Sequence, residues 1–238
     1  MRRTHFIISS FTLTSILILA SCRTNETANS KNVNPDAVFF DYRIWAEESR
    51  EDVTVNLQYR AGGKNGTALM LHEPSKVLLD GEQLKADSAK VTGFFYEAQK
   101  PLASFPGKHV ITFTSPDNKE YKEEFEFVPF TLDPDVPAVM YRGDLVFNFK
   151  GLDSVAYVGV ALTDTSFRSS DINDLDTVRN GRLVIAAHRL SALTNGPINL
   201  QFYKEIEKPL NNTTKKGGRL YISYGMKREF ELRGVENL

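Results

Sequence analysis

Four oxygen-bearing side chains lie close together in the chain and form the first candidate binding site. They are Asp171, Asn173, Asp174 and Asp176. Calcium binds several oxygen ligands from one loop, so a calcium site is one interpretation. The helix-loop-helix calcium pattern fails, however, because Leu175 stands at its fifth position and Asp176 stands where glycine is required. We therefore expect no metal here and interpret residues 163–181 as a long solvated loop, the first place to look for a ligand contact.

The single tryptophan, Trp45, is the second candidate. Sugars stack their apolar face on flat aromatic rings, so an exposed tryptophan would be a platform for a glycan. Trp45 alternates in opposite phase to Phe40 and Tyr42 along a segment with the period of a strand. We prefer the other interpretation, that the ring packs at a sheet edge or under a loop, because tryptophan is mostly buried. A ring exposed beside a groove would favour the first interpretation, and a buried ring the second.

Recognisable catalytic motifs are absent from the sequence. It contains neither a Gly-x-Ser-x-Gly nucleophile turn nor a phosphate-binding Gly-x-x-x-x-Gly-Lys loop. The four histidines are scattered without the spacing of metal ligands. The acidic residues at 47–52 suit a charged turn better than a pair of glycosidase carboxylates. We expect a protein that is not an enzyme and that needs no cofactor.

The only cysteine, Cys22, ends a short apolar segment near the start of the chain. Two arginines precede the segment, which spans residues 6–20 and is interrupted only by hydroxyl side chains. This is the pattern of a secretory signal, and it is shorter than the roughly 20 residues of a membrane-spanning helix. Leu19-Ala20-Ser21-Cys22 resembles the lipobox of bacterial lipoproteins. The resemblance implies that residues 1–21 are a signal peptide and that lipidated Cys22 holds the protein on a membrane.

The segment after the lipobox is polar, and residues 22–34 are expected to be a disordered tether. Its first ten residues contain one acid, Glu26, so it does not resemble the acid-rich tethers of some surface lipoproteins of Bacteroidota. This favours an outer-membrane location facing the periplasm. The whole chain has 29 Lys+Arg and 30 Asp+Glu, and such a balance argues against nucleic acid as a partner. The expected partners are the membrane, through the lipid, and an envelope protein or a glycan.

Period-two alternation of apolar residues predicts short strands in two stretches, residues 35–130 and 138–238. Asp80-Gly81 predicts a tight hairpin turn. Residues 131–137 contain two prolines and are expected to be a linker. The predicted fold is all-β, with two tandem antiparallel immunoglobulin-like β-sandwiches.

Weaker resemblances concern the ends of the two predicted sandwiches. Residues 105–127 resemble the closing hairpin of bacterial immunoglobulin-like domains, and residues 182–234 resemble domains of Bacteroidota-type envelope lipoproteins that have no assigned activity. Three triplets of acidic, hydroxyl and apolar residues also resemble the O-glycosylation signal of Bacteroidota envelope proteins. The hydroxyl residues concerned are Ser88, Ser154 and Thr177.

These observations lead to one preferred function and two alternatives. The preferred hypothesis is a non-enzymatic, lipid-anchored binding or spacer module of the cell envelope. The first alternative is a glycan-binding accessory lipoprotein of an outer-membrane polysaccharide uptake system, with Trp45 as a contact. The second is an enzyme with an unfamiliar site, which would require carboxylates or histidines clustered in a pocket.

Overall fold

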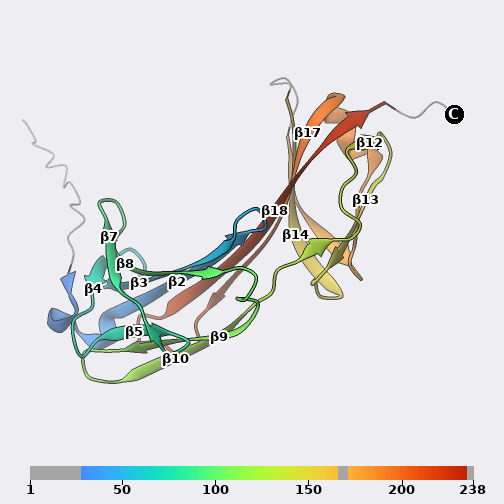
Figure 1. The fold of residues 1–238 in the computed structure, drawn as a ribbon. Helices are drawn as coiled ribbons and strands as arrows, with labels where there is room; N and C mark the ends of the chain where they lie inside the picture. Colours follow the sequence, from blue (N-terminus) through green and yellow to red (C-terminus); the bar gives the residue numbers. More distant parts are fainter. Residues whose placement is uncertain (1–27, 166–170, 235–238) are drawn as a thin grey trace, which may run out of the picture.

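The computed structural model describes residues 28–165 and 171–234, and its regular structure is almost entirely β (Figure 1). Three short 3-10 segments are η1 (Ser30–Asn32), η2 (Pro35–Ala37) and η3 (Ala187–Ala192). The strands are β1 (Ala28–Asn29), β2 (Val38–Glu47), β3 (Asp52–Ala61), β4 (Thr67–Met70), β5 (Lys76–Leu79), β6 (Glu82–Gln83), β7 (Ala86–Ala89), β8 (Gly93–Pro101), β9 (Gly107–Thr114), β10 (Glu120–Phe127), β11 (Thr131–Leu132), β12 (Val139–Tyr141), β13 (Leu145–Lys150), β14 (Val155–Asp164), β15 (Ile172–Arg179), β16 (Arg182–Ile185), β17 (Gly196–Pro209) and β18 (Gly218–Arg233). The prediction of an all-β fold with sandwich-like sheets is confirmed. No helix in the described part of the chain is long and apolar enough to cross a membrane.

The first half of the molecule is a sandwich of two sheets. A four-stranded sheet in the order β10-β9-β5-β6 faces the part of a large sheet that contains β3, β2 and β18 (Figure 1). Strict alternation produces this arrangement: β10 buries Tyr121, Glu123, Phe125 and Phe127 and exposes the residues between them. The core between the sheets is rich in aromatic rings, and Phe40 lies 5.0 Å from Phe113 between ring centroids.

Two hairpin turns have the backbone that their sequences require. At Asp80-Gly81 both φ angles are positive, 51° and 86°, and the turn joins β5 to β6. At Asn180-Gly181 the angles are 49° and 75°, and the turn joins β15 to β16. Positive φ at both central residues is the mark of a type I′ turn, whose twist matches that of the flanking strands. The predicted hairpin at Asp80-Gly81 is confirmed.

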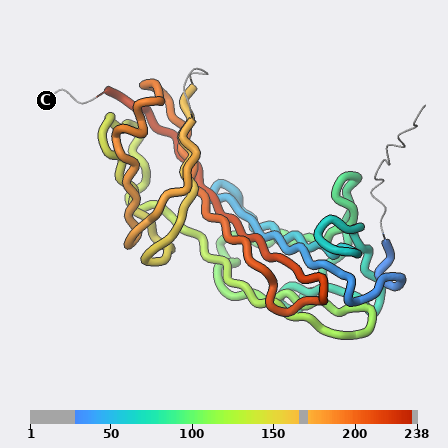
Figure 2. Tube along the Cα trace, turned by 180° about the vertical axis from the view of Figure 1, so that it is seen from behind, coloured from blue at the N-terminus to red at the C-terminus, as the bar shows by residue number. Residues whose placement is uncertain are grey.

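The β17–β18 hairpin is the longest element and runs through both halves of the molecule (Figure 2). Near its turn, residues 218–225 of β18 pair in parallel with residues 40–47 of β2. At its open end, residues 198–203 of β17 pair with β14. The sequence analysis assigned all of residues 138–238 to the second sandwich, whereas the turn half of the hairpin forms part of the first. β18 itself is one continuous strand of 16 residues.

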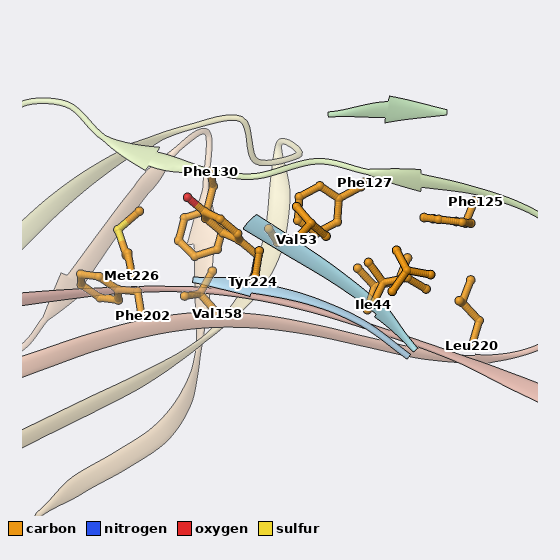
Figure 3. Close-up of a cluster of buried hydrophobic side chains, with 14 of the residues drawn as sticks. Ile44, Val53, Phe125, Phe127, Phe130, Val158, Phe202, Leu220, Tyr224 and Met226 are labelled. Carbon is orange, nitrogen blue, oxygen red and sulfur yellow. The ribbon is translucent and has the colours of Figure 1, made fainter. Parts of the chain in front are cut away.

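The junction between the halves is packed with aromatic rings (Figure 3). Phe130 is fully buried, and its ring centroid lies 5.2 Å from that of Tyr224 and 5.7 Å from that of Phe149. On the surface of the junction, the guanidinium of Arg228 pairs with Glu48 in the turn after β2 and with Asp135 in the predicted linker. Packing and ion pairs therefore hold the two halves in one arrangement.

The predicted loop over residues 163–181 is wrong for most of its length. Residues 155–162 of β14 pair with residues 172–179 of β15, so that only a short connection remains between the two strands. Ile172 and Val178 face the core, while the polar residues between them hid the strand's period. The strand forms with few apolar side chains because Asp174 and Asp176 pair with a cation, Arg189.

Candidate functional site

Trp45 stands exposed on the outer face of the large sheet, with 37% of its surface accessible. Its neighbours along β2, Ile44 and Ala46, are buried on the opposite face. Because side chains alternate along a strand, the burial of Ile44 and Ala46 forces the tryptophan outward. The interpretation of Trp45 as a buried packing residue is therefore not supported, and the ring stands between two depressions of the surface.

One depression, of about 540 Å³, lies over β3, β2, β18 and the β7–β8 hairpin, and we call it the arginine depression. Opposite residues on paired strands supply much of its lining: Arg43 lies across from Asn56 on β3 and from Tyr221 on β18. The residues that line it are Arg43, Trp45, Asn56, Gln58, Arg60, Ala89, Thr92, Phe95, Tyr221 and Ser223. It combines aromatic rings with amide, hydroxyl and guanidinium groups.

The other depression, of about 410 Å³, lies over β2, β18, β17, β14 and β15, and we call it the glutamate depression. The ring of Tyr203 crosses its floor directly over Gly159, where an added Cβ would lie 2.1 Å from the ring. The Tyr203 hydroxyl donates to Asn173 Oδ1 at 3.0 Å. Glu47 and Glu205 are its acidic lining residues, and Trp45 and Ser223 belong to both depressions.

Hydrogen bonds fix several of the polar groups around Trp45. Gln58 Nε2 donates to two backbone carbonyls of the β7–β8 hairpin, those of Thr92 and Phe94. Its Oε1 accepts from Arg60 at 2.7 Å. The Tyr221 hydroxyl donates to Glu205, and burial together with that carboxylate raises the pKa of Tyr221 to about 12. Tyr221 therefore stays protonated at neutral pH.

Beneath the arginine depression, Asp41 is a nearly buried carboxylate, with 3% of its side chain exposed. It accepts two hydrogen bonds from Arg219, at 2.8 and 3.0 Å, and two longer ones from Arg43, at 3.3 and 3.4 Å. Burial alone would raise the pKa of Asp41, but the hydrogen bonds from the two guanidinium groups outweigh it and hold that pKa below its usual value. The carboxylate is therefore ionised at neutral pH and orients both arginines.

We expect Asp41→Asn to lower the free energy of unfolding at pH 7 by about 1–3 kcal/mol, because charge-assisted hydrogen bonds are lost. A depressed pKa in the folded state gives stability that is present above the unfolded value, about 3.9, and is lost as the pH falls through the folded value. The difference between wild type and Asp41→Asn should therefore shrink toward pH 2.5 in urea titrations. An equal difference at pH 7 and pH 2.5 would contradict this role.

The acidic residues singled out in the sequence lie on β15 or just before it. Asp174 and Asp176 both pair with Arg189 of η3, at 2.7 and 2.8 Å. Asn173 accepts from Tyr203 and lines the glutamate depression, whereas Asp171 lies just before the strand and exposed. In the described part of the chain no group of three or more His, Cys, Asp or Glu side chains could hold a metal ion. The structure thus brings Trp45 and Asn173 to one surface and engages Asp174 and Asp176 elsewhere.

The predicted modification sites divide into two groups. Cys22 lies outside the described residues, so its lipidation stays a prediction. Ser88, Ser154 and Thr177 are all exposed, and their glycosylation stays a prediction as well.

Sequence analysis missed most residues of the Trp45 surface, notably Arg43, Arg60 and Tyr203. Their outward phase on β2, β3 and β17 was readable from the alternation with buried neighbours. What was not readable is the parallel pairing of β2 with β18, which brings together residues more than 170 positions apart.

No family model and no curated protein matches this chain. Solved structures overlap with it at low identity. The two-immunoglobulin-domain structure of DIP-gamma is 10% identical over 84% of this chain and 96% of that chain, with a TM-score of 0.22. The fibronectin(III)-like modules of Clostridium thermocellum CbhA are 10% identical over 84% and 96%, with a TM-score of 0.26. Bacteroides ovatus SGBP-B, from a mixed-linkage glucan utilization locus and solved in complex with a mixed-linkage heptasaccharide, is 9% identical over 87% and 66%, with a TM-score of 0.18. With TM-scores this low, no function passes from these proteins to the present chain by similarity.

Proposed function

We propose that this protein is a non-enzymatic, lipid-anchored binding module of the cell envelope that binds a glycan on the surface around Trp45. The observation that carries the proposal is the exposed indole between two depressions lined by amide, hydroxyl and charged groups. A sugar ring has an apolar face and a rim of hydroxyl groups, so it needs both kinds of contact.

The surrounding strands support this proposal because they position the ring before a ligand arrives. The strand that carries Trp45, β2, is paired with a strand on each side. Opposite Trp45 lie Thr54 on β3 and Ser223 on β18. A platform on paired strands loses little conformational entropy when it binds. Volumes of 410 and 540 Å³ fall within the range of small-molecule sites and suit a short stretch of oligosaccharide.

The membrane part of the proposal rests on the lipobox at Cys22, on the polar tether after it and on the preceding apolar segment. A lipid there would keep the Trp45 surface close to the outer membrane, on the periplasmic side, where it would hold polysaccharide for uptake. Intact-mass measurement of the protein from its native membrane tests the anchor. A mass without acyl chains would contradict the anchor, and a mass showing lipid alone would remove the proposed glycosylation of Ser88, Ser154 and Thr177.

Glycan binding is tested with Trp45→Ala against a panel of immobilised neutral and acidic polysaccharides. We expect the wild type to bind at least one of them and Trp45→Ala to bind it about tenfold or more weakly, because a central aromatic contact contributes at least about 1.4 kcal/mol. Trp45→Phe should retain part of the affinity. The matched control is Tyr157→Ala, which removes a ring that is 61% exposed on β14.

Two results would contradict glycan binding at this surface. One is a wild-type protein that binds no polysaccharide of the panel. The other is a bound glycan whose affinity is unchanged in Trp45→Ala and reduced in Tyr157→Ala. Thermal unfolding of each variant shows whether a loss of binding has a cause other than loss of the fold.

A further inference from the structure

We infer that the arginine depression binds an anionic sugar, with Arg43 and Arg60 receiving its carboxylate or sulfate group while Trp45 contacts the ring. This inference rests on the proposed function and specifies which class of glycan the surface takes. It follows from the distribution of charge on the two sides of Trp45.

The two depressions differ sharply in charge. Arg43 and Arg60 line the arginine depression, and none of its lining residues in the described chain is acidic. The glutamate depression has the opposite character, since Glu47 and Glu205 line it without any basic residue among its described lining. A ligand that spans Trp45 therefore meets positive charge at one end and negative charge at the other, so its orientation is fixed.

Arg60 is held in place by neutral groups. One of its terminal nitrogens donates to the Gly66 carbonyl at 3.2 Å and the other to Gln58 Oε1 at 2.7 Å. Gln58 is itself fixed by hydrogen bonds to the Thr92 and Phe94 carbonyls. These contacts orient the guanidinium without neutralising its charge, so the charge remains available to a ligand.

Arg43 shares the single carboxylate of Asp41 with Arg219. Arg219 has the shorter hydrogen bonds to Asp41, and nearly half of the Arg43 side chain is exposed. Arg219 also pairs with Glu207 at 3.4 Å, so its charge is met by two carboxylates, whereas Arg43 has only its two longer hydrogen bonds to Asp41 and keeps N–H groups free to reach a ligand. Guanidinium groups bind carboxylate and sulfate oxygens through paired N–H donors, which suits them to an acidic sugar better than to a neutral one.

The glutamate depression completes the specificity. Glu205 already accepts from the Tyr221 hydroxyl, and Glu47 pairs with Lys227 at 3.3 Å. Carboxylates with remaining acceptor capacity accept hydrogen bonds from sugar hydroxyls and repel a second anion. The surface therefore favours a glycan in which an acidic sugar unit is followed by a neutral one. It disfavours a glycan with acidic sugar units on both sides of Trp45.

The test compares probes that differ in charge and share a backbone. Titration calorimetry uses oligogalacturonate, the same oligosaccharide with its carboxylates methyl-esterified to half and to completion, a sulfated galactan oligosaccharide and a neutral galactan oligosaccharide. We expect an anionic probe to bind at least tenfold more tightly than its fully esterified or unsulfated counterpart, and we expect added salt to weaken that binding. The half-esterified probe should bind best among the galacturonates, while a preference for the sulfated galactan would identify sulfate as the group bound.

The variants separate the charged contact from the ring contact. Arg43→Gln and Arg60→Gln should each reduce binding of the anionic probe about tenfold and reduce binding of the neutral probes by much less, and Arg43→Lys should recover part of the loss. Arg182→Gln, which changes an exposed arginine on β16 of the other half, is the control and should change nothing. Equal affinity for charged and uncharged probes, with no effect of either arginine variant, would overturn the anionic subsite while leaving Trp45-dependent glycan binding intact. A wild-type protein that binds none of the probes would overturn the proposed function itself.

Discussion

Phe130→Ala is expected to lower the free energy of unfolding by about 3–5 kcal/mol, the range for removing a large aromatic side chain from a core. The ring is fully buried at the junction and packs edge-on against Phe149 of the second half and Tyr224 of the hairpin. The strand that carries Tyr224, β18, runs into both halves, so it cannot close on the cavity without moving one of them. Urea unfolding followed by circular dichroism measures the loss.

The control for this variant is Val128→Ala, two residues earlier in the same segment. Val128 is 44% exposed, and its truncation should cost less than about 0.5 kcal/mol. We also expect Phe130→Ala to unfold in one transition, because the same two strands belong to both halves. A variant that loses the signal of one half at low urea and that of the other half at high urea would contradict a shared core.

Ser223→Pro is expected to lower the free energy of unfolding by more than about 3 kcal/mol and to disrupt both halves together. Ser223 lies in β18 with Trp45 of β2 on one side and Glu205 of β17 on the other. Proline removes a backbone donor from a strand that is paired on both edges, and its ring opposes the paired backbone. Thermal unfolding and limited proteolysis measure the effect.

The matched control is Ser223→Ala, which keeps the backbone donor at the same position and should unfold like the wild type. The prediction would be contradicted if proteolysis of Ser223→Pro left a resistant fragment that covers only the second half. Such a fragment would mean that the second sandwich folds without the turn half of the hairpin, as two independent tandem domains would.

Local patterns in the sequence predicted much of the fold. The alternation in β10 and in residues 42–46 of β2 and the Asp80-Gly81 turn depend on residues close in the chain, and the burial of these strand residues follows directly from period two. β15 was missed because Asp174 and Asp176 look like loop residues until Arg189 is placed beside them. β18 continues through Gly225 because strands pair with it on both sides, with Tyr203 of β17 opposite on one side and Glu47 of β2 on the other.

The candidate site was predicted only at its centre. The phase of Trp45 against Phe40 and Tyr42 was visible in the sequence, and it correctly separated an outward ring from inward ones. The depressions beside the ring were not visible, since Arg60, Tyr221 and Tyr203 come from three further strands. Pairing of β2 with β18 has a sequence separation that no local pattern encodes, and it is this pairing that places Trp45 in the middle of a broad surface.

The shared β17–β18 hairpin also determines how the molecule would respond to mechanical load. β18 has 16 residues, and at about 3.4 Å per residue it forms a continuous rod of roughly 54 Å. A pull between the start of β2 and the far end of β18 would load the hydrogen bonds of parallel residues 40–47 and 218–225 in shear, so that many must break at once. A force applied between the two ends of the described chain would therefore be resisted by this pair of strands.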